Sequence, residues 1–249
     1  KALTEAFLHI NATIPTKNSG GCTASVLLRI DNKVYIANVG DSRTFVVAYH
    51  QETKKVKIIY QSREDKPHLD AEKARIEQMG GEVYIPSKEM MESGEDSSRT
   101  VIMDRTTGFQ SSLAMSRSLG DWTFSSAGVI ALPIVEVVNL TQFSQGNTQS
   151  GRKNCEEATK NSVRKTCVSE ANSNSTKIFS VAASDGLLDF ISPNELATTL
   201  AYSLYDEDGQ EPHPATASEQ LILKAADKWK EEMGYEYRDD IVISVMKLI

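Results

Sequence analysis

The sequence predicts an α+β fold built from antiparallel strands and helices. Several short segments rich in β-branched and aromatic residues follow one another with short polar connections, which is typical of an antiparallel meander. Segments with helical periodicity and recognisable helix ends follow them. The chain has 249 residues, of which 40% are apolar and 24% charged, as expected of a globular domain with a sizeable core.

The first four predicted strands are Ala24–Ile30, Val34–Val39, Phe45–Tyr49 and Val56–Tyr60. The turn Asp31-Asn32-Lys33 separates the first two, so they are expected to pair as a β-hairpin. Because all the connections are short and polar, the four strands are expected to continue as one meander.

The middle of the chain alternates between regular and polar stretches. A helix is predicted over Asp70–Met79, with Asp70 as its cap and Gly80-Gly81 as its end. A buried strand is predicted over Ile178–Ala183. Residues 86–108 are polar with few strand signals, and residues 141–177 are rich in Ser, Asn, Thr, Gln and Lys. We expect the second of these segments to be a disordered surface insertion.

The last quarter of the chain carries the clearest helical signals. Ser192-Pro193-Asn194-Glu195 is a capping box that opens a helix reaching to about Leu204. A strongly amphipathic helix is predicted over Ala217–Met233, ended by Gly234. Its apolar face is expected to consist of Ile222, Ala226, Trp229 and Met233. A final strand is predicted over Ile241–Ile249.

Composition and charge restrict the possible partners. The formal net charge of -7 argues against nucleic acid or an anionic membrane as a partner, and is compatible with cation binding. No run of eighteen apolar residues occurs, so no membrane span is predicted. The three cysteines do not form a disulfide framework, and Cys22 is expected to be a small core residue. The expected compartment is the cytosol or the nucleus.

Three aspartates stand at the ends of predicted strands. Asp41 and Asp185 follow strands, Asp239 precedes one, and Asp189 comes four residues after Asp185, one helical turn away. Hard oxygen ligands of this kind suit Mg²⁺ or Mn²⁺ better than zinc. Each residue alone has an ordinary alternative role, as a turn residue or a helix cap. The four histidines are scattered and show no ligand spacing.

Six blocks of residues stand out, in order along the chain. They are Ser19-Gly20-Gly21-Cys22-Thr23-Ala24; Val39-Gly40-Asp41-Ser42-Arg43; Asp65-Lys66-Pro67 with Glu72, Arg75-Ile76 and Gly80-Gly81; Leu113-Ala114-Met115-Ser116-Arg117-Ser118-Leu119-Gly120-Asp121 with Gly128-Val129-Ile130; Ala183-Ser184-Asp185-Gly186-Leu187-Leu188-Asp189; and Arg238-Asp239-Asp240-Ile241. Together these blocks resemble the metal-dependent protein serine/threonine phosphatases of type 2C. Each block is a weak signal by itself, but the ordered set extends over nearly the whole chain.

The resemblance implies one domain over residues 1–249, a four-layer α-β-β-α sandwich of two antiparallel sheets flanked by helices. It implies a pair of Mn²⁺ or Mg²⁺ ions held by Asp185 and Asp239. Asp41 and Asp189 would belong to a weaker site for a third ion. Residues 86–130 would include a flap beside the active site. The implied activity is hydrolysis of phosphoserine and phosphothreonine in phosphoproteins by a metal-activated water, in a monomeric enzyme.

Two departures from the family pattern stand out. The family's Asp-Gly-His-Gly block is not found, and its general-acid His and phosphate-binding Arg would lie upstream of Lys1. We therefore expect the front of the domain to be missing, and the chain by itself to be an impaired enzyme. Asp240 stands where the family usually has Asn. The alternative interpretation is a pseudophosphatase that serves as a binding or scaffold module.

Overall fold

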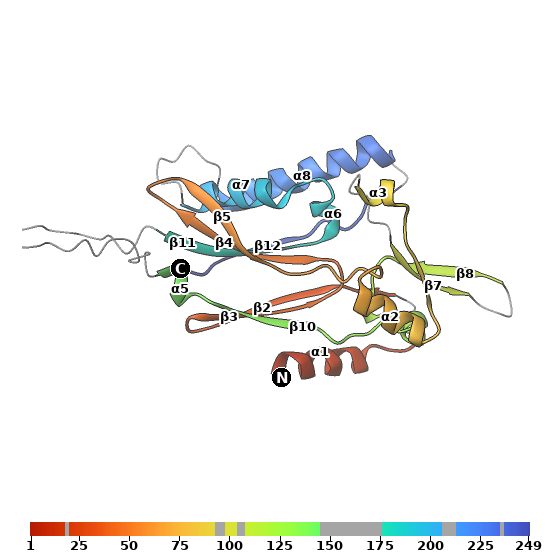
Figure 1. Cartoon of the computed structure of the whole chain (residues 1–249). Helices are drawn as coiled ribbons and strands as arrows, with labels where there is room; N and C mark the ends of the chain where they lie inside the picture. Colours follow the sequence, from red (N-terminus) through yellow and green to blue (C-terminus); the bar gives the residue numbers. More distant parts are fainter. Residues whose placement is uncertain (18–19, 93–97, 104–107, 145–175, 206–212, 235–236) are drawn as a thin grey trace, which may run out of the picture.

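The computed structural model describes residues 1–17, 20–92, 98–103, 108–144, 176–205, 213–234 and 237–249. These residues form four layers (Figure 1). The helices α7 (Pro193–Tyr205) and α8 (Pro214–Met233) cover one sheet, a second sheet packs beneath it, and α1 (Ala2–Thr13) covers the second sheet from below. This arrangement confirms the α+β sandwich expected from the sequence. Of the helices described, none is long and apolar enough to cross a membrane.

The upper sheet has four strands in the order β12-β11-β4-β5, and every pair is antiparallel. Its members are β12 (Ile243–Lys247), β11 (Thr176–Ala183), β4 (Arg43–His50) and β5 (Lys55–Gln61). The two central strands, β4 and β11, are buried on both faces. This explains why their sequences contain continuous runs of apolar residues, many of them β-branched or aromatic.

The lower sheet has three antiparallel strands in the order β10-β3-β2, namely β10 (Ile134–Asn139), β3 (Lys33–Val39) and β2 (Ala24–Ile30). The predicted hairpin of the first two strands is therefore confirmed. The predicted meander is wrong, because β3 and β4 lie in different sheets. The chain crosses from one sheet to the other at Gly40–Ser42, and β4 pairs instead with β11, far away in the sequence.

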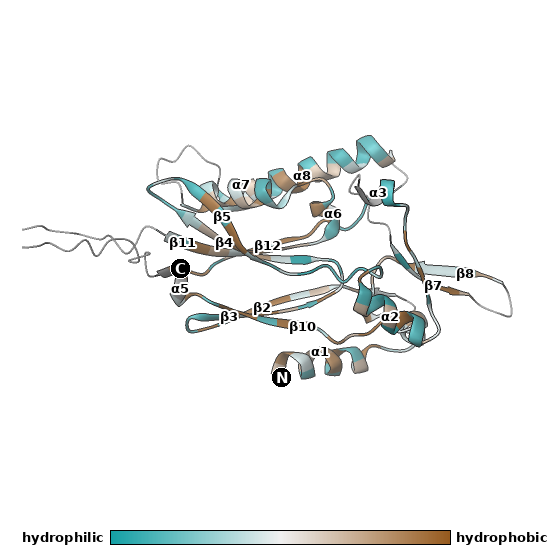
Figure 2. Ribbon diagram, viewed as in Figure 1, coloured by the Kyte–Doolittle hydropathy of each residue, from teal (hydrophilic) through white to brown (hydrophobic). Residues whose placement is uncertain are grey.

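Three hydrophobic clusters fill the three interfaces between the layers. Alternation along the strands decides which cluster each side chain joins. On β4, Phe45, Val47 and Tyr49 pack toward α7 and α8, whereas Val46 packs against Val34 and Ile36 of the lower sheet. The third cluster joins the lower sheet to α1 through Phe7, Ala37 and Val39. In Figure 2 the strands of the two main sheets carry many hydrophobic residues, and the C-terminal end of α8 is mostly hydrophilic.

One end of the sandwich carries smaller elements. Strands β6 (Glu82–Tyr84), β7 (Arg99–Met103) and β8 (Gln110–Leu113) form a separate antiparallel sheet, set apart from the main sheets in Figure 1. The other short elements are β1 (Gly21–Cys22), β9 (Leu119–Gly120), α2 (Asp70–Gln78), α3 (Lys88–Glu92), α4 (Trp122–Ser125), α6 (Asp185–Leu188) and, at the opposite end of the sandwich in Figure 1, α5 (Thr141–Ser144). Residues 86–108 thus contain a strand that the sequence did not predict. Of the predicted insertion 141–177, residues 145–175 lie outside the described residues.

The helix ends differ in detail from the predictions. Helix α2 has Leu69 as its N-cap, so Asp70 belongs to the first turn and is not the cap. Helix α7 has the predicted cap, because the Glu195 N–H donates to Ser192 Oγ at 3.2 Å. The Glu195 carboxylate pairs with Lys224 of α8.

Helix α8 starts at Pro214, three residues earlier than predicted, with His213 as its cap. Its buried residues are Ala217, Leu221, Ala225 and Trp229. The predicted face was therefore centred one residue too late, and Met233 is exposed. Apolar residues at neighbouring positions make two adjacent faces of this helix suitable for burial, and packing against α6 and α7 in the cluster over the upper sheet selects one of them.

Candidate metal site

The crossover between the two sheets places the first predicted ligand. Gly40 has a φ of 99°, and a Cβ there would lie 2.4 Å from Thr23 Cγ2, so only glycine fits this turn. Thr23 and Ser42 share a 2.7 Å hydrogen bond between their hydroxyl groups, which joins the turn to the segment before β2. Asp41 follows directly and is only 2% exposed. A rigid turn therefore holds a carboxylate inside the protein.

The second and third predicted ligands come from two loops in direct contact. Asp185 is the first residue of α6, immediately after β11, and its Oδ1 accepts from the Gly186 N–H at 3.0 Å. A Cβ on Gly186 would lie 2.7 Å from the Asp240 carbonyl oxygen and 3.0 Å from Asp239 Cβ. Glycine at this position thus lets the loop that carries Asp239 approach Asp185 closely.

Ser184 and Trp229 hold these two loops together. Ser184 Oγ donates to the Asp240 carbonyl oxygen at 2.7 Å and accepts from the Val242 N–H at 2.9 Å. The Trp229 indole N–H donates to the Gly186 carbonyl oxygen at 2.7 Å, and its ring makes edge contacts with Phe190 and Tyr237. A residue of α8 thereby positions the backbone beside both carboxylates.

A cavity of about 680 Å³ opens beside these loops. Its lining includes the acids Asp41, Asp185, Asp239 and Asp240, together with residues of β1, β2, β8 and β11. Cys22 also lines the cavity and is an exposed free thiol, so its predicted place in the core is wrong. In the part of the chain that the structure describes, β1 pairs with the two-residue strand β9 alone, outside the two main sheets, and both of its residues are exposed.

Two observations test whether these residues fit a divalent cation. Burial, followed by the charges of Asp41 and Asp239, raises the pKa of Asp185 to about 7, because carboxylates repel one another in a poorly hydrated site. Asp41 Oδ1 is buried and has no hydrogen-bond partner. Oxygen donors whose negative charge is only partly compensated fit a hard divalent cation such as Mg²⁺ or Mn²⁺.

The predicted ligands do not form a closed shell. Among the described residues, no group of three or more His, Cys, Asp or Glu side chains is placed to hold one ion. Asp41, Asp185 and Asp239 share the cavity, whereas Asp189 is the exposed C-cap of α6 and does not line it. The charge of Asp189 nevertheless contributes to the raised pKa of Asp185, so it belongs to the same electrostatic cluster.

Lys66 is a member of the cluster that the sequence did not identify. Its ammonium group lies 2.9 Å from Asp41 Oδ2, and the two side chains are 13% and 1% exposed. Burial lowers the pKa of Lys66, but the charges of Asp41, Glu64 and Asp185 outweigh burial and raise it above its usual value. Lys66 occurs in one of the six blocks, but its partner is 25 residues away in the sequence, so no local spacing links them.

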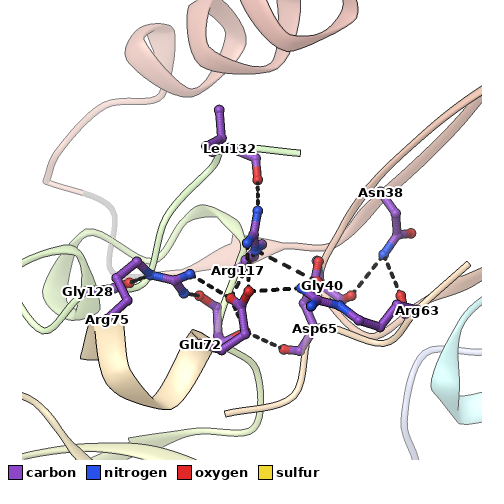
Figure 3. A network of polar contacts seen from close by, with 10 residues as sticks. Asn38, Gly40, Arg63, Asp65, Glu72, Arg75, Arg117, Gly128 and Leu132 are labelled. Atoms are coloured by element: carbon purple, nitrogen blue, oxygen red, sulfur yellow. Dashed lines mark hydrogen bonds and ion pairs between the residues drawn. The ribbon is translucent and has the colours of Figure 1, made fainter. Parts of the chain in front are cut away.

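A buried network of charges supports the Asp41 turn (Figure 3). Asp65 Oδ2 accepts from the Gly40 N–H at 3.1 Å, and the Asp65 N–H donates to the Gly40 carbonyl oxygen at 3.0 Å. Glu72, only 1% exposed, pairs with Arg63, Arg75 and Arg117. The turn that presents Asp41 is thus anchored to α2 through ion pairs.

The ionisation of Glu72 follows from these contacts. Burial favours the neutral acid, but hydrogen bonds and charges from Arg117 and Arg75 outweigh it and lower the pKa of Glu72 to about 2. Glu72 therefore stays ionised through the neutral range, and the network keeps its form under ordinary conditions.

Comparison with known proteins finds one family along most of the chain. Residues 1–232 match the family described as "Protein phosphatase 2C". The chain is 26% identical over 231 residues to "Probable protein phosphatase 2C 61" of Arabidopsis thaliana, covering 93% of this chain and 56% of that protein. It is 32% identical over 121 residues to "Integrin-linked kinase-associated serine/threonine phosphatase 2C" of Bos taurus, covering 49% of this chain and 27% of that protein. The chain thus spans about half or less of the length of these curated relatives.

Solved structures agree on the fold. A serine-threonine phosphatase 2C from Toxoplasma gondii superimposes with a TM-score of 0.61 at 16% identity, covering 99% of this chain and 62% of that one. A C. elegans sex determining protein superimposes with a TM-score of 0.58 at 16% identity, covering 98% of this chain and 46% of that one. At these identities the likeness establishes the architecture.

Proposed function

Because the chain belongs to the protein phosphatase 2C family, we propose that it catalyses the hydrolysis of phosphoserine and phosphothreonine in proteins and that this activity requires Mn²⁺ or Mg²⁺. The observation that carries the proposal is that Asp41, Asp185 and Asp239 line one cavity, where Asp41 is buried with its Oδ1 left without a partner and the other two acids are partly buried. A cation offsets the repulsion that this cluster otherwise suffers.

The chain's own residues supply binding and orientation. Asp185 and Asp239 would hold the catalytic ions, and Asp41 with Asp189 would hold a further ion beside them. Divalent cations supply an activated water and neutralise the charge on a phosphate group. The cavity of about 680 Å³ is large enough to admit a phosphorylated side chain, with Arg99 and Tyr237 in its wall.

We further propose that residues 1–249 by themselves are an impaired enzyme. The described side chains place no group of three acids or histidines around one ion, whereas a divalent cation of this kind needs about six ligands. Waters and further donors have to complete the shell, so the affinity of this chain for metal ions is expected to be low.

The test is an assay of the purified chain on a phosphothreonine peptide with added Mn²⁺. Slow turnover that disappears with EDTA, and disappears in Asp185→Asn, supports the proposal. Asp227→Asn is the matched control, because it removes an exposed carboxylate on α8 and is expected to leave turnover unchanged. Turnover that persists in thoroughly chelated samples contradicts the metal requirement.

The alternative function is that of a non-catalytic binding module. The lack of a closed ligand shell among the described residues favours it. Absence of turnover at every Mn²⁺ concentration, together with retained binding of phosphorylated peptides, would support this alternative over catalysis.

A further inference from the structure

The ion pair between Lys66 and Asp41 lies where a cation would be expected to bind. Asp41 is 2% exposed, and one of its oxygens accepts from the Lys66 ammonium at 2.9 Å while the other has no partner. The ammonium group also lies within the electrostatic influence of Asp185. A single positive charge on a flexible side chain thus already partly neutralises the acidic cluster.

We propose that Lys66 is an internal counter-ion that competes with a divalent cation for Asp41 and so keeps the metal affinity of this part of the site low. The proposal rests on the proposed function in so far as Asp41 is taken as a metal ligand. Lys66 is then a positioning residue, since it acts on the cation only through Asp41.

The surroundings of Lys66 allow such an exchange. Asp41 lines the main cavity, whereas Lys66 lines a second cavity of about 500 Å³ that also contains Glu64 and Glu136. The Lys66 ammonium already experiences the charge of Glu64. When a divalent cation takes Asp41, the four-carbon side chain of Lys66 can turn toward these two carboxylates, of which Glu64 pairs with Arg43 at 3.1 Å and Glu136 accepts from the Tyr60 hydroxyl at 2.6 Å.

The backbone on both sides is fixed, which confines the exchange to side chains. The Gly40 turn is hydrogen-bonded to Asp65 in both directions, and Asp65 is the residue directly before Lys66. Asp65 is in turn paired with Arg63 at 2.8 Å. The backbone atoms of Asp41 and Lys66 therefore keep their separation, so the exchange requires rotation of the Lys66 side chain alone.

The experiment measures Mn²⁺ binding directly, from the electron paramagnetic resonance signal of the free ion, in the wild-type chain and in Lys66→Met. Because removing a contacting positive charge strengthens the attraction of the carboxylate for a cation, Lys66→Met is expected to bind Mn²⁺ about tenfold more tightly than wild type. Lys57→Met is the matched control, since it removes an exposed lysine of β5 and is expected to leave the affinity unchanged.

Thermal unfolding provides a second measurement that separates this role from a purely structural one. Lys66→Met should melt at a lower temperature than wild type in EDTA, because Asp41 is left buried and unpaired. It should show a larger rise in melting temperature when Mn²⁺ is added. A structural role alone would lower the melting temperature equally with and without Mn²⁺, and that result would overturn the proposal.

The outcomes separate this inference from the proposed function. Equal or weaker Mn²⁺ affinity in Lys66→Met, with phosphatase turnover intact in the wild type, overturns the role of Lys66 alone. Tighter binding in Lys66→Met, with no turnover in either protein, supports the role of Lys66 and counts against catalysis. If neither protein binds Mn²⁺, both proposals are wrong.

Discussion

The surroundings of Asp185 in the cavity disfavour the ionised form of its side chain. Burial and the charges of Asp41 and Asp239 all disfavour its ionised form, and the charge of Lys66 offsets them only in part. Its raised pKa means that the folded protein binds more protons than the unfolded chain between the usual value of 3.8 and about 7. The stability of the metal-free protein should therefore fall as the pH rises through this window.

Substitution Asp185→Asn should remove this dependence. In EDTA at pH values above about 7 the variant is expected to melt several degrees higher than wild type, since each 1 kcal/mol shifts the melting temperature of a chain this size by about 2–4 °C. Below the usual carboxyl pKa the gain should vanish, because Asp185 is then protonated in both the folded and unfolded states. Differential scanning fluorimetry across the pH range measures the effect.

Asp227→Asn serves as the control for the loss of one negative charge on an exposed helix surface. A stability gain in Asp185→Asn that is the same at acidic and alkaline pH would show that repulsion at the cavity is not its origin.

At the scale of elements, Glu72 joins α2 to the segment between β8 and β9. Its carboxylate accepts from Arg117 Nη2 at 2.6 Å and from Ser116 Oγ at 2.9 Å, and both donors belong to that segment. Arg63, which precedes α2, contributes a further ion pair at 2.9 Å. One buried acid thus satisfies donors from three parts of the chain, and its loss would leave positive charges unpaired.

Glu72→Gln is expected to lower stability by about 3–5 kcal/mol, the range for breaking one partner of a buried ion-pair network. Chemical unfolding in urea at neutral pH measures this loss. Glu77→Gln is the matched control on the same helix, because Glu77 is exposed and pairs with Lys73 across 3.7 Å at the surface. Similar small effects of the two substitutions would show that the network contributes little.

The same network predicts the behaviour in acid. The pKa of Glu72 is depressed to about 2, so its contribution to stability is present above the usual carboxyl pKa of 4.5 and is lost as the pH falls toward 2. The difference between wild type and Glu72→Gln should therefore shrink steadily over that window.

At the scale of the whole molecule, the two main sheets each end in a strand that pairs on one side only. Among the described residues, β2 pairs only with β3, and β12 only with β11. Both ends expose apolar side chains, including Leu28 at 44% and Met246 at 41%. Unprotected edges with apolar residues favour strand addition between molecules.

The chain of residues 1–249 is therefore expected to self-associate as its concentration rises, in contrast to the monomer that the resemblance implies. Leu28→Lys should reduce the association, because a charge on an edge strand opposes pairing. Leu223→Lys, which alters an exposed leucine on α8 and not on an edge strand, should leave it unchanged. Size-exclusion chromatography with light scattering over a concentration series decides, and a monomer at all concentrations would contradict this prediction.

Local signals predicted much of the fold correctly. The hairpin of Ala24–Ile30 and Val34–Val39 follows from alternation and a short turn, and the Ser192 cap and the end at Gly234 follow from helix-end chemistry. The errors occurred where the local sequence is compatible with more than one arrangement. The face of α8 was assigned one residue late, and Cys22 was placed in the core because its apolar neighbours suggested burial.

The sequence by itself determined most strands of the two main sheets, the helices over α2, α7 and α8, the family and the presence of carboxylates at strand ends, because these depend on residues close together along the chain. Only the tertiary structure decided that β3 and β4 enter different sheets, which places Asp41 at a crossover between the layers. It also brought Lys66 onto Asp41 and Trp229 onto the Gly186 carbonyl, 25 and 43 residues apart. Such contacts depend on which strands pair and which helix face docks, and these choices are made by burial across the whole domain.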